Sequence, residues 1–139
     1  MIRVVLDTNV LVSALISPLG NEALVLDAVQ NGWIVPCLTR EIVEEYAEVL
    51  ARPRFSFARK EIDGLLGLLE LKGMLFEPLP APGTSSDPGD ECFIECALQG
   101  NADFIVTGNK RHFPAESCAP AKVVSARELL ELLRAQRSR

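Results

Sequence analysis

Short apolar runs alternate with longer amphipathic stretches along this chain. Each run is only a few residues long and mostly apolar, which is typical of a strand that is buried on both faces of a sheet. The runs lie at residues 2–6, 33–35, 74–76, 104–107 and 122–124. We predict a strand at each of them, and we expect the second to end at Pro36, because proline cannot donate to a strand ladder.

The stretches between these runs carry helix signals. Thr39 is placed to cap a helix that follows it, and Ser125 with Glu128 forms a capping-box pattern before the last amphipathic stretch. Asp87-Pro88-Gly89-Asp90 has a cap, a proline and an acid in the order typical of a helix start. The predicted helices cover residues 9–16, 21–31, 40–51, 59–72, 88–100 and 126 onward, the last with Leu129, Leu130, Leu132 and Leu133 on its inner side.

Strands that alternate with helices favour a parallel sheet with helices on both faces. A chain of 139 residues has the length of one domain. We therefore predict a single α/β domain over residues 1–139, built on a central parallel sheet of about five short strands with helices on both faces.

The composition excludes several classes of protein. The chain is 48% hydrophobic with a net charge of −5, which excludes intrinsic disorder and does not suit a broad basic face for duplex DNA. No apolar stretch approaches the roughly 20 residues of a membrane helix, so we expect no membrane association. The first carboxylate, Asp7, comes too soon for a signal peptide, and we expect a cytoplasmic protein. We expect the cysteines, which lack zinc-ligand spacing, to be inert thiols.

Polar residues follow two of the predicted strands. Asp7 comes directly after the first strand, and Asn109 comes shortly after the fourth. In an open parallel sheet, ligands bind beyond the carboxyl ends of the strands, so both residues belong at the edge where a site is expected. Asp103 precedes its strand and belongs at the opposite edge.

Two further acids are directed inward from predicted helices. At 100° per residue, Asp90 lies along the middle of the apolar face of its helix. Glu45 is the nearest of its helix's glutamates to the apolar stripe, with a margin of about 20° over Glu44. Taken singly, Asp90 could instead complete a helix cap and Glu45 could be a solvated side chain. Together with Asp7, they could converge on one edge of the sheet.

Three such acids favour a hard divalent cation. The chain has no catalytic cysteine arrangement and no Gly-rich phosphate loop, and Mg²⁺ and Mn²⁺ prefer oxygen ligands. Phosphodiester hydrolysis is the natural chemistry of such a site, because a cation polarises the phosphate and lowers the pKa of water.

Four segments resemble the motifs of PIN-domain ribonucleases. They are residues 6–11, 45–50, 87–90 with Ala97-Leu98, and 102–109. Their order and spacing fit the chain from end to end, and the chain is most similar to toxin components of prokaryotic toxin–antitoxin pairs (VapC-like). The resemblance implies Mg²⁺- or Mn²⁺-dependent cleavage of single-stranded RNA, leaving a 5′-phosphate and a 3′-hydroxyl. It also implies a homodimer and inhibition by an antitoxin protein.

The resemblance also assigns roles to individual residues. It makes Asp7, Glu45 and Asp90 the catalytic acids and metal ligands, supported by hydrogen bonds from Thr8, Asn9 and Thr107. Asn109 stands where many members of the family carry a fourth acid. An amide can ligate a cation or orient water but brings no charge, so we expect a weaker or single-metal site. Alternatively, Asn109 is a structural turn residue.

Cations near these motifs are candidates for RNA binding. Lys110 and Arg111 follow the fourth strand, and Arg52 and Arg54 follow the helix that carries Glu45. They could contact phosphates beside the site, although a charged loop is as often merely solvated. His112 lies next to the first pair, but metal-activated water needs no imidazole as a general base.

Two alternative functions remain at the level of sequence. A catalytically weak module would bind RNA or an antitoxin peptide without efficient cleavage, because Asn109 removes a negative charge. A phosphatase with Asp7 as its nucleophile would need a second acid two residues later, and that position holds Asn9.

Overall fold

The centre of the fold is a twisted parallel sheet. The computed structural model describes residues 1–77 and 90–137. Within these residues the strands form one five-stranded sheet in the order β3-β2-β1-β4-β5, and all neighbouring strands are parallel. The strands are β1 (Ile2–Leu6), β2 (Ile34–Leu38), β3 (Met74–Leu75), β4 (Phe104–Val106) and β5 (Lys122–Val124). The predicted α/β fold is confirmed.

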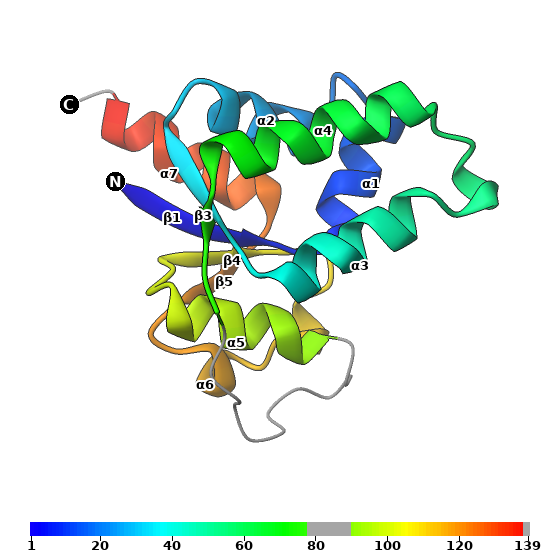
Figure 1. Ribbon diagram of the computed structural model, residues 1–139. Helices are drawn as coiled ribbons and strands as arrows, with labels where there is room; N and C mark the ends of the chain where they lie inside the picture. Colours follow the sequence, from blue (N-terminus) through cyan, green and yellow to red (C-terminus); the bar gives the residue numbers. More distant parts are fainter. Residues whose placement is uncertain (78–89, 138–139) are drawn as a thin grey trace.

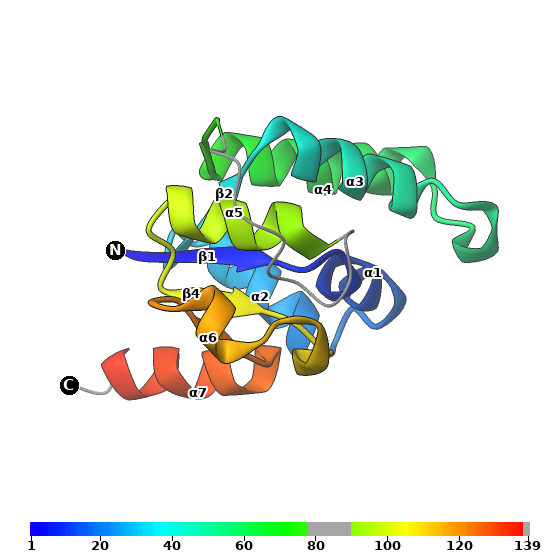
Figure 2. The same ribbon diagram turned by 90° about the horizontal axis from the view of Figure 1, so that it is seen from below.

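Helices cover both faces of the sheet. They are α1 (Thr8–Ile16), α2 (Asn21–Gln30), α3 (Arg40–Leu50), α4 (Arg59–Lys72), α5 (Glu91–Gln99), α6 (Ala115–Cys118) and α7 (Ala126–Arg137). Figure 1 shows α5 and α6 on one side of the sheet and α2, α4 and α7 on the other, and Figure 2 shows the same layers from below. This double cover explains why the central strands are apolar: Val4, Val5 and Ile105 are fully buried.

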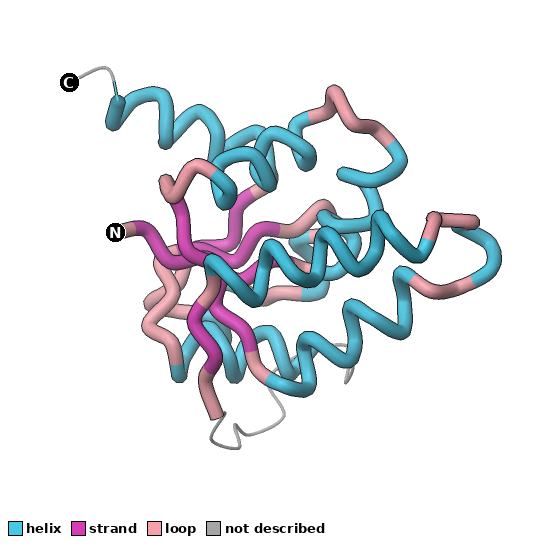
Figure 3. Tube along the Cα trace, turned by 45° about the horizontal axis from the view of Figure 1, so that its top comes forward, coloured by secondary structure: helices cyan, strands magenta, loops and turns pink. Residues whose placement is uncertain are grey.

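Helices α3 and α4 extend beyond the carboxyl ends of the strands as a hairpin (Figure 3). A short 3₁₀ turn at Pro53–Phe55 lies at its tip. Phe55 and Phe57 stack there with ring centroids 5.4 Å apart. Both pack partly against the core, so the tip is an ordered part of the domain.

Three details of the sequence prediction are corrected. Strand β2 continues through Pro36 to Leu38. Its ladder with β1 ends at Pro36 and its ladder with β3 begins at Cys37, so the proline lies where the strand changes partner. Leu132 is 43% exposed, because it points about 90° away from the buried stripe of α7. Helix α6 was not predicted, since four residues are too few to show a helical period.

The described helices were also compared with the dimensions of a membrane span. Within residues 1–77 and 90–137, no single helix is both long and apolar enough to cross a membrane. In the same described part of the chain, one pair of helices, α1 with α2, has the combined length and apolar character of a span, and the two are bent by 105° at the break between them. Both helices contribute side chains such as Leu11 and Val29 to the hydrophobic core.

Helix α3 is fixed to the sheet by two buried polar contacts. The side chain of Thr39 accepts a hydrogen bond of 3.1 Å from the backbone N–H of Ile42, which confirms its predicted role as N-cap. The hydroxyl of Tyr46 donates to the carbonyl oxygen of Leu6 across 2.5 Å, and Tyr46 is only 1% exposed. Because Leu6 is the last residue of β1, this bond sets the position of α3 relative to the strand's carboxyl end.

We expect Tyr46→Phe to lower the free energy of unfolding by about 1–3 kcal/mol, because the carbonyl of Leu6 loses a buried donor. Urea denaturation followed by circular dichroism measures the change. Leu19→Ala, at a position that is 96% exposed, is the control and should leave the stability nearly unchanged. A Tyr46→Phe variant as stable as the parent chain would show that this bond does not fix α3.

Candidate active site

Asp7 is a buried carboxylate at the carboxyl end of the central strand. Its backbone N–H donates to the carbonyl oxygen of Val106 across 2.9 Å, so Asp7 lies where β1 and β4 end side by side. Its side chain is held by the hydroxyl of Thr107, which donates to Oδ2 across 2.7 Å. The residue is 5% exposed. Asp7 therefore lies at the strand end, as predicted from the sequence, and its carboxylate is largely shielded from solvent.

The pKa of Asp7 is raised above its ordinary value of 3.8, chiefly because burial disfavours the charged form. The hydrogen bond from Thr107 and the backbone amides of Thr8 and Asn9 lower this pKa and offset part of the effect. The negative charge of Glu45 raises it further. Two carboxylates thus repel each other at this edge of the sheet.

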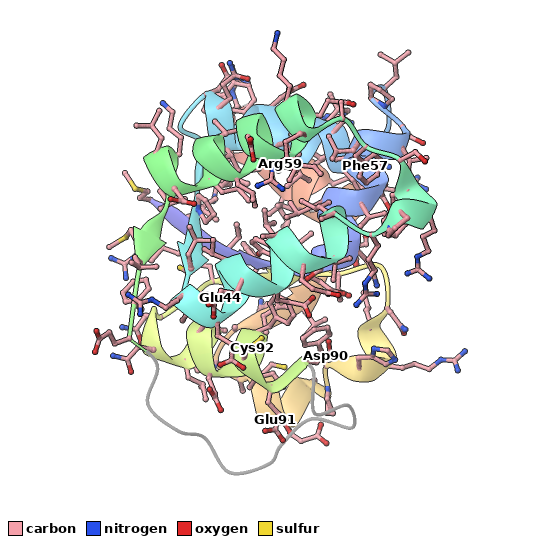
Figure 4. All side chains as sticks on the ribbon, turned by 45° about the vertical axis from the view of Figure 1, so that its right-hand side comes forward. Glu44, Phe57, Arg59, Asp90, Glu91 and Cys92 are labelled. Carbon is pink, nitrogen blue, oxygen red and sulfur yellow. The ribbon has the colours of Figure 1, made fainter. Side chains whose placement is uncertain are left out.

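Glu45 reaches the same edge from α3. The hydroxyl of Thr8 donates to its Oε2 across 2.6 Å, and this bond links α3 to the first residue of α1. Glu45 is half-buried, whereas Glu41, Glu44 and Glu48 are exposed. Figure 4 shows Glu44 on the outer surface of α3. Glu45, which was predicted to lie nearest to the apolar stripe, is therefore the most buried of the four glutamates.

Asp90 lies at the start of α5, in the position that precedes its first residue. The predicted cap at Asp87, with Pro88 and Gly89, falls outside the described residues. The Asp90 side chain is 13% exposed, and its Oδ2 lies 3.1 Å from Nδ1 of His112. Two residues further on, burial raises the pKa of Cys92 to about 12, and the charges of Glu41, Glu45 and Asp90 also raise it. Glu45 and Asp90 therefore both lie within electrostatic reach of the Cys92 thiol.

The segment after β4 connects these groups. The backbone N–H of Asn109 donates to the hydroxyl oxygen of Thr107 across 3.0 Å. The side-chain amide nitrogen of Asn109 lies 3.2 Å from Nε2 of His112. His112 therefore belongs to the site. From the sequence it was considered only as a general base, and its contact with Asp90 was not predicted. No local pattern could have revealed its contact with Asp90, which precedes it by more than twenty residues.

The predicted RNA-binding cations differ in their surroundings. Lys110 is paired with Glu128 across 2.5 Å, and Arg52 is paired with Glu48 across 2.9 Å. The guanidinium of Arg54 lies 4.8 Å from the centre of the Phe55 ring at the tip of the hairpin. Arg111 is exposed on the same turn as Lys110. The four cations thus fall on two separate elements, the hairpin of α3 and α4 and the turn after β4.

All four cysteines of the chain are buried. Cys37, Cys92, Cys96 and Cys118 form no disulfide with one another. Burial raises the pKa of Cys37 to about 11 and that of Cys96 to about 12, so both remain thiols near neutral pH. That the cysteines have no metal or redox role stays a prediction.

The donor set fits a magnesium-like cation only in a limited way. Among residues 1–77 and 90–137 there is no group of three or more histidine, cysteine or acidic side chains arranged to hold a metal. The structure instead offers the neighbouring acids Asp7 and Glu45, with Asp90 next to His112. Mg²⁺ is commonly bound by one or two carboxylates, several waters and substrate phosphates rather than by a complete protein cage. The repelling pair is therefore suited to such an ion.

Burial of the Asp7 charge predicts a stability cost that depends on pH. The pKa of Asp7 is higher in the folded chain than in the unfolded one, so stability falls as pH rises from the unfolded value through the folded value. Asp7→Asn removes this pH-dependent loss of stability, and its side-chain amide oxygen can still accept the hydrogen bond from Thr107. Without divalent cations at pH 7, we expect its melting temperature to be about 3–5 °C higher.

Calorimetry between about pH 4 and about pH 8 measures the melting temperatures of the variant and the parent chain. The difference between them should become smaller as the pH falls, because Asp7 is then protonated in the parent. Asp27→Asn, at an exposed position of α2, is the matched control and should not change the melting temperature. An Asp7→Asn variant less stable than the parent at pH 7 would contradict the account.

Comparison with known proteins identifies the family to which the sequence belongs. A model of the PIN domain family matches residues 3–111, which is more than half of the chain. No curated protein and no solved structure matches the sequence. The matched stretch contains Asp7, Glu45, Asp90 and Asn109, and His112 is the first residue beyond it. PIN domains are generally nucleases, and this chain belongs to the PIN domain family.

Proposed function

We propose that this PIN domain is a cytoplasmic, Mg²⁺- or Mn²⁺-dependent endoribonuclease that hydrolyses single-stranded RNA to 5′-phosphate and 3′-hydroxyl ends. The observation that carries the proposal is the buried Asp7 carboxylate beside Glu45 at the carboxyl edge of the sheet. Burying a carboxylate next to another one is costly, and a cation between them would offset the cost. Such an arrangement is more easily explained by a binding role than by a contribution to stability.

The residues of the chain would hold and orient the reacting groups. When bound, Mg²⁺ or Mn²⁺ supplies a Lewis acid for the phosphate and lowers the pKa of a water molecule. Thr107 holds Oδ2 of Asp7, and Thr8 holds Oε2 of Glu45, so each acid has one oxygen fixed by a hydroxyl. These hydrogen bonds set the directions of the two carboxylates before any ligand arrives.

A cavity beside Thr107 supports an RNA substrate. It has a volume of about 240 Å³ and shares Thr107 with the Asp7 hydrogen bond. The residues that line it include Asn9, Asn21, Glu22 and Arg127. Side-chain amides can hydrogen-bond to the Watson–Crick edge of a base only when that base is unpaired, and we take the two asparagines as support for single-stranded RNA.

The toxin role, the antitoxin and the homodimer are parts of the same proposal. Apolar side chains are exposed at the sheet edge and near the start of α2, including Leu75 (70%) and Leu19 (96%). A second cavity of about 310 Å³, lined by Leu38, Val43 and Leu75, lies beside edge strand β3. Exposed apolar surface of this kind supports a protein partner.

A catalytically weak binding module is the second candidate. It is favoured by the contact between Asp90 and His112 and by the absence of a three-ligand group among the described residues. Cleavage that depends on Asp7 and on Mn²⁺ separates the two candidates. A phosphatase would instead form a covalent phosphate on Asp7, which mass spectrometry would detect.

We expect purified chain to cleave single-stranded RNA with Mn²⁺, and Asp7→Asn to reduce the rate at least about 100-fold by removing a ligand charge. Glu45→Gln should reduce it similarly, whereas Glu44→Gln, on the exposed face of the same helix, should stay within about twofold of the parent. Product end groups and initial rates with and without EDTA measure these effects. RNA binding without Mn²⁺-dependent cleavage would favour the binding module instead.

Arg111 should contribute to RNA affinity through phosphate contacts. In an Asp7→Asn background, Arg111→Ala should lower the slope of log affinity against log salt by about 0.7, the value for one phosphate contact on a single strand. Fluorescence anisotropy with a labelled RNA, at salt concentrations from about 50 to about 200 mM, measures the slope. Arg59→Ala is the control, because Arg59 pairs with Asp63 across 3.2 Å. Equal slopes for the two variants would exclude this contact.

A further inference from the structure

The tip of the hairpin formed by α3 and α4 is strongly basic. Residues 52–60, which we call the hairpin tip, hold four of the chain's 14 lysines and arginines and no acid, whereas the whole chain carries a net charge of −5. The hairpin extends beyond the carboxyl ends of the strands, the edge at which Asp7 and Glu45 lie (Figure 3). Positive charge is therefore concentrated at the same end of the sheet as the acids of the candidate site.

Acids outside the hairpin tip offset two of these positive charges. Arg52 pairs with Glu48 across 2.9 Å, and Arg59 pairs with Asp63 across 3.2 Å. Within residues 1–77 and 90–137, no carboxylate forms an ion pair with Arg54. Arg54 therefore brings a positive charge that no acid in the described part of the chain neutralises by direct contact.

The guanidinium of Arg54 is held against an aromatic ring. Its central carbon lies 4.8 Å from the centre of the Phe55 ring, and Phe55 stacks on Phe57 with the two ring planes 7° apart. Both rings pack partly against the core. A guanidinium is attracted to the face of an aromatic ring, so this contact limits the rotamers of a side chain that would otherwise be mobile. Binding of a phosphate would then cost less conformational entropy.

The backbone of the hairpin tip is closed by hydrogen bonds. Ser56 adopts the left-handed conformation with a φ of 53°. Its backbone N–H donates to the carbonyl oxygen of Pro53 across 3.1 Å, and its hydroxyl donates to the same oxygen across 3.2 Å. Arg54 and Phe55 lie between these two residues, so the turn that carries the guanidinium has a defined shape.

The hairpin tip lies close enough to the acids to contact the same RNA strand. Arg54 follows Glu45 by nine residues, and α3 continues to Leu50. At a rise of about 1.5 Å per helical residue and at most about 3.6 Å for each residue after it, the two residues lie no more than about 22 Å apart. A single strand of a few nucleotides spans such a distance.

The candidate site also needs cations outside its acids. Asp7 and Glu45 repel the phosphates of RNA, so affinity for the strand has to come from positive charges around them. Lys110 is already paired with Glu128. Arg54 lies on a different element from Arg111, and the two would hold one strand at two points.

From these observations we propose that the hairpin tip is a second contact for single-stranded RNA, in which Arg54, held on Phe55, binds a phosphate a few nucleotides from the one that is cleaved. A guanidinium suits this role because it can bind two oxygens of one phosphate. The inference rests on the proposed ribonuclease function and adds a substrate preference to it. The chain should favour long single strands, which reach both the acids and the hairpin tip, over short ones.

Cleavage of a short and a long RNA tests this preference. With Mn²⁺ and single strands of about 3 and about 12 nucleotides, we expect Arg54→Ala to raise KM for the long RNA about fivefold at unchanged kcat, and to leave kcat/KM for the short RNA within about twofold of the parent. Lys72→Ala is the matched control, because it removes the same charge from the exposed opposite end of α4. It should leave both substrates unaffected.

Binding of the long RNA in EDTA, followed by fluorescence anisotropy, is a second readout that needs no cleavage. Arg54→Ala should lower the slope of log affinity against log salt by about 0.7, the value for one phosphate contact on a single strand. Phe55→Leu keeps an apolar side chain and the charge of Arg54 but removes the ring. It should weaken binding about twofold to threefold without changing the slope, because the phosphate contact remains but is no longer ordered in advance.

The outcomes separate this proposal from the proposed function. Unchanged binding and cleavage of the long RNA in Arg54→Ala would overturn the proposal and leave an acidic segment of a protein as the alternative ligand of the hairpin tip. Equal losses for short and long RNA, or the same loss in Lys72→Ala, would also overturn it. If the parent shows no Mn²⁺-dependent cleavage but Arg54→Ala still lowers the salt slope, the metal-dependent function fails while the RNA contact stands.

Discussion

The burial of one carboxylate, that of Asp7, is the constraint on which the rest of the site depends. Its position is fixed because the backbone continues the pairing of β1 with β4, so the side chain emerges between two strand ends. The hydroxyl of Thr107 and the backbone amides that follow Asp7 stabilise the charged form but do not cancel the cost of burial. Glu45 adds to that cost rather than relieving it. The site therefore costs stability, and the proposed binding of a positively charged ligand would offset that cost.

Around this carboxylate, the fold places polar contacts where elements meet. Tyr46 joins α3 to the last residue of β1, and Thr8 joins α1 to α3. The same helix that buries Tyr46 in the core therefore carries Glu45 to the edge of the sheet. His112 has the corresponding place on the other side, between the turn after β4 and the start of α5. The acids are thus held by contacts between elements that are distant in the sequence.

Local signals explain how much of this arrangement could be predicted from the sequence. The cap at Thr39 and the capping box of Ser125 with Glu128 were predicted and confirmed, because each involves residues only a few positions apart. The end of β2 was placed wrongly at Pro36, because the change of partner strand depends on β3, which is distant in the chain. The contact of His112 with Asp90 and the pairing of Lys110 with Glu128 have no local signature for the same reason. The pair of Glu48 and Arg52 has helical spacing and could have been anticipated.

The central claim is that Asp7 and Glu45 form the binding site of a divalent cation. Crystals of the chain soaked in Mn²⁺ and measured at the manganese absorption edge test it most directly. The account predicts an anomalous peak in direct contact with carboxylate oxygens of Asp7 and Glu45, and its loss in Asp7→Asn. A fully soaked crystal without a peak between these two side chains, or with a peak that persists in Asp7→Asn, would contradict it.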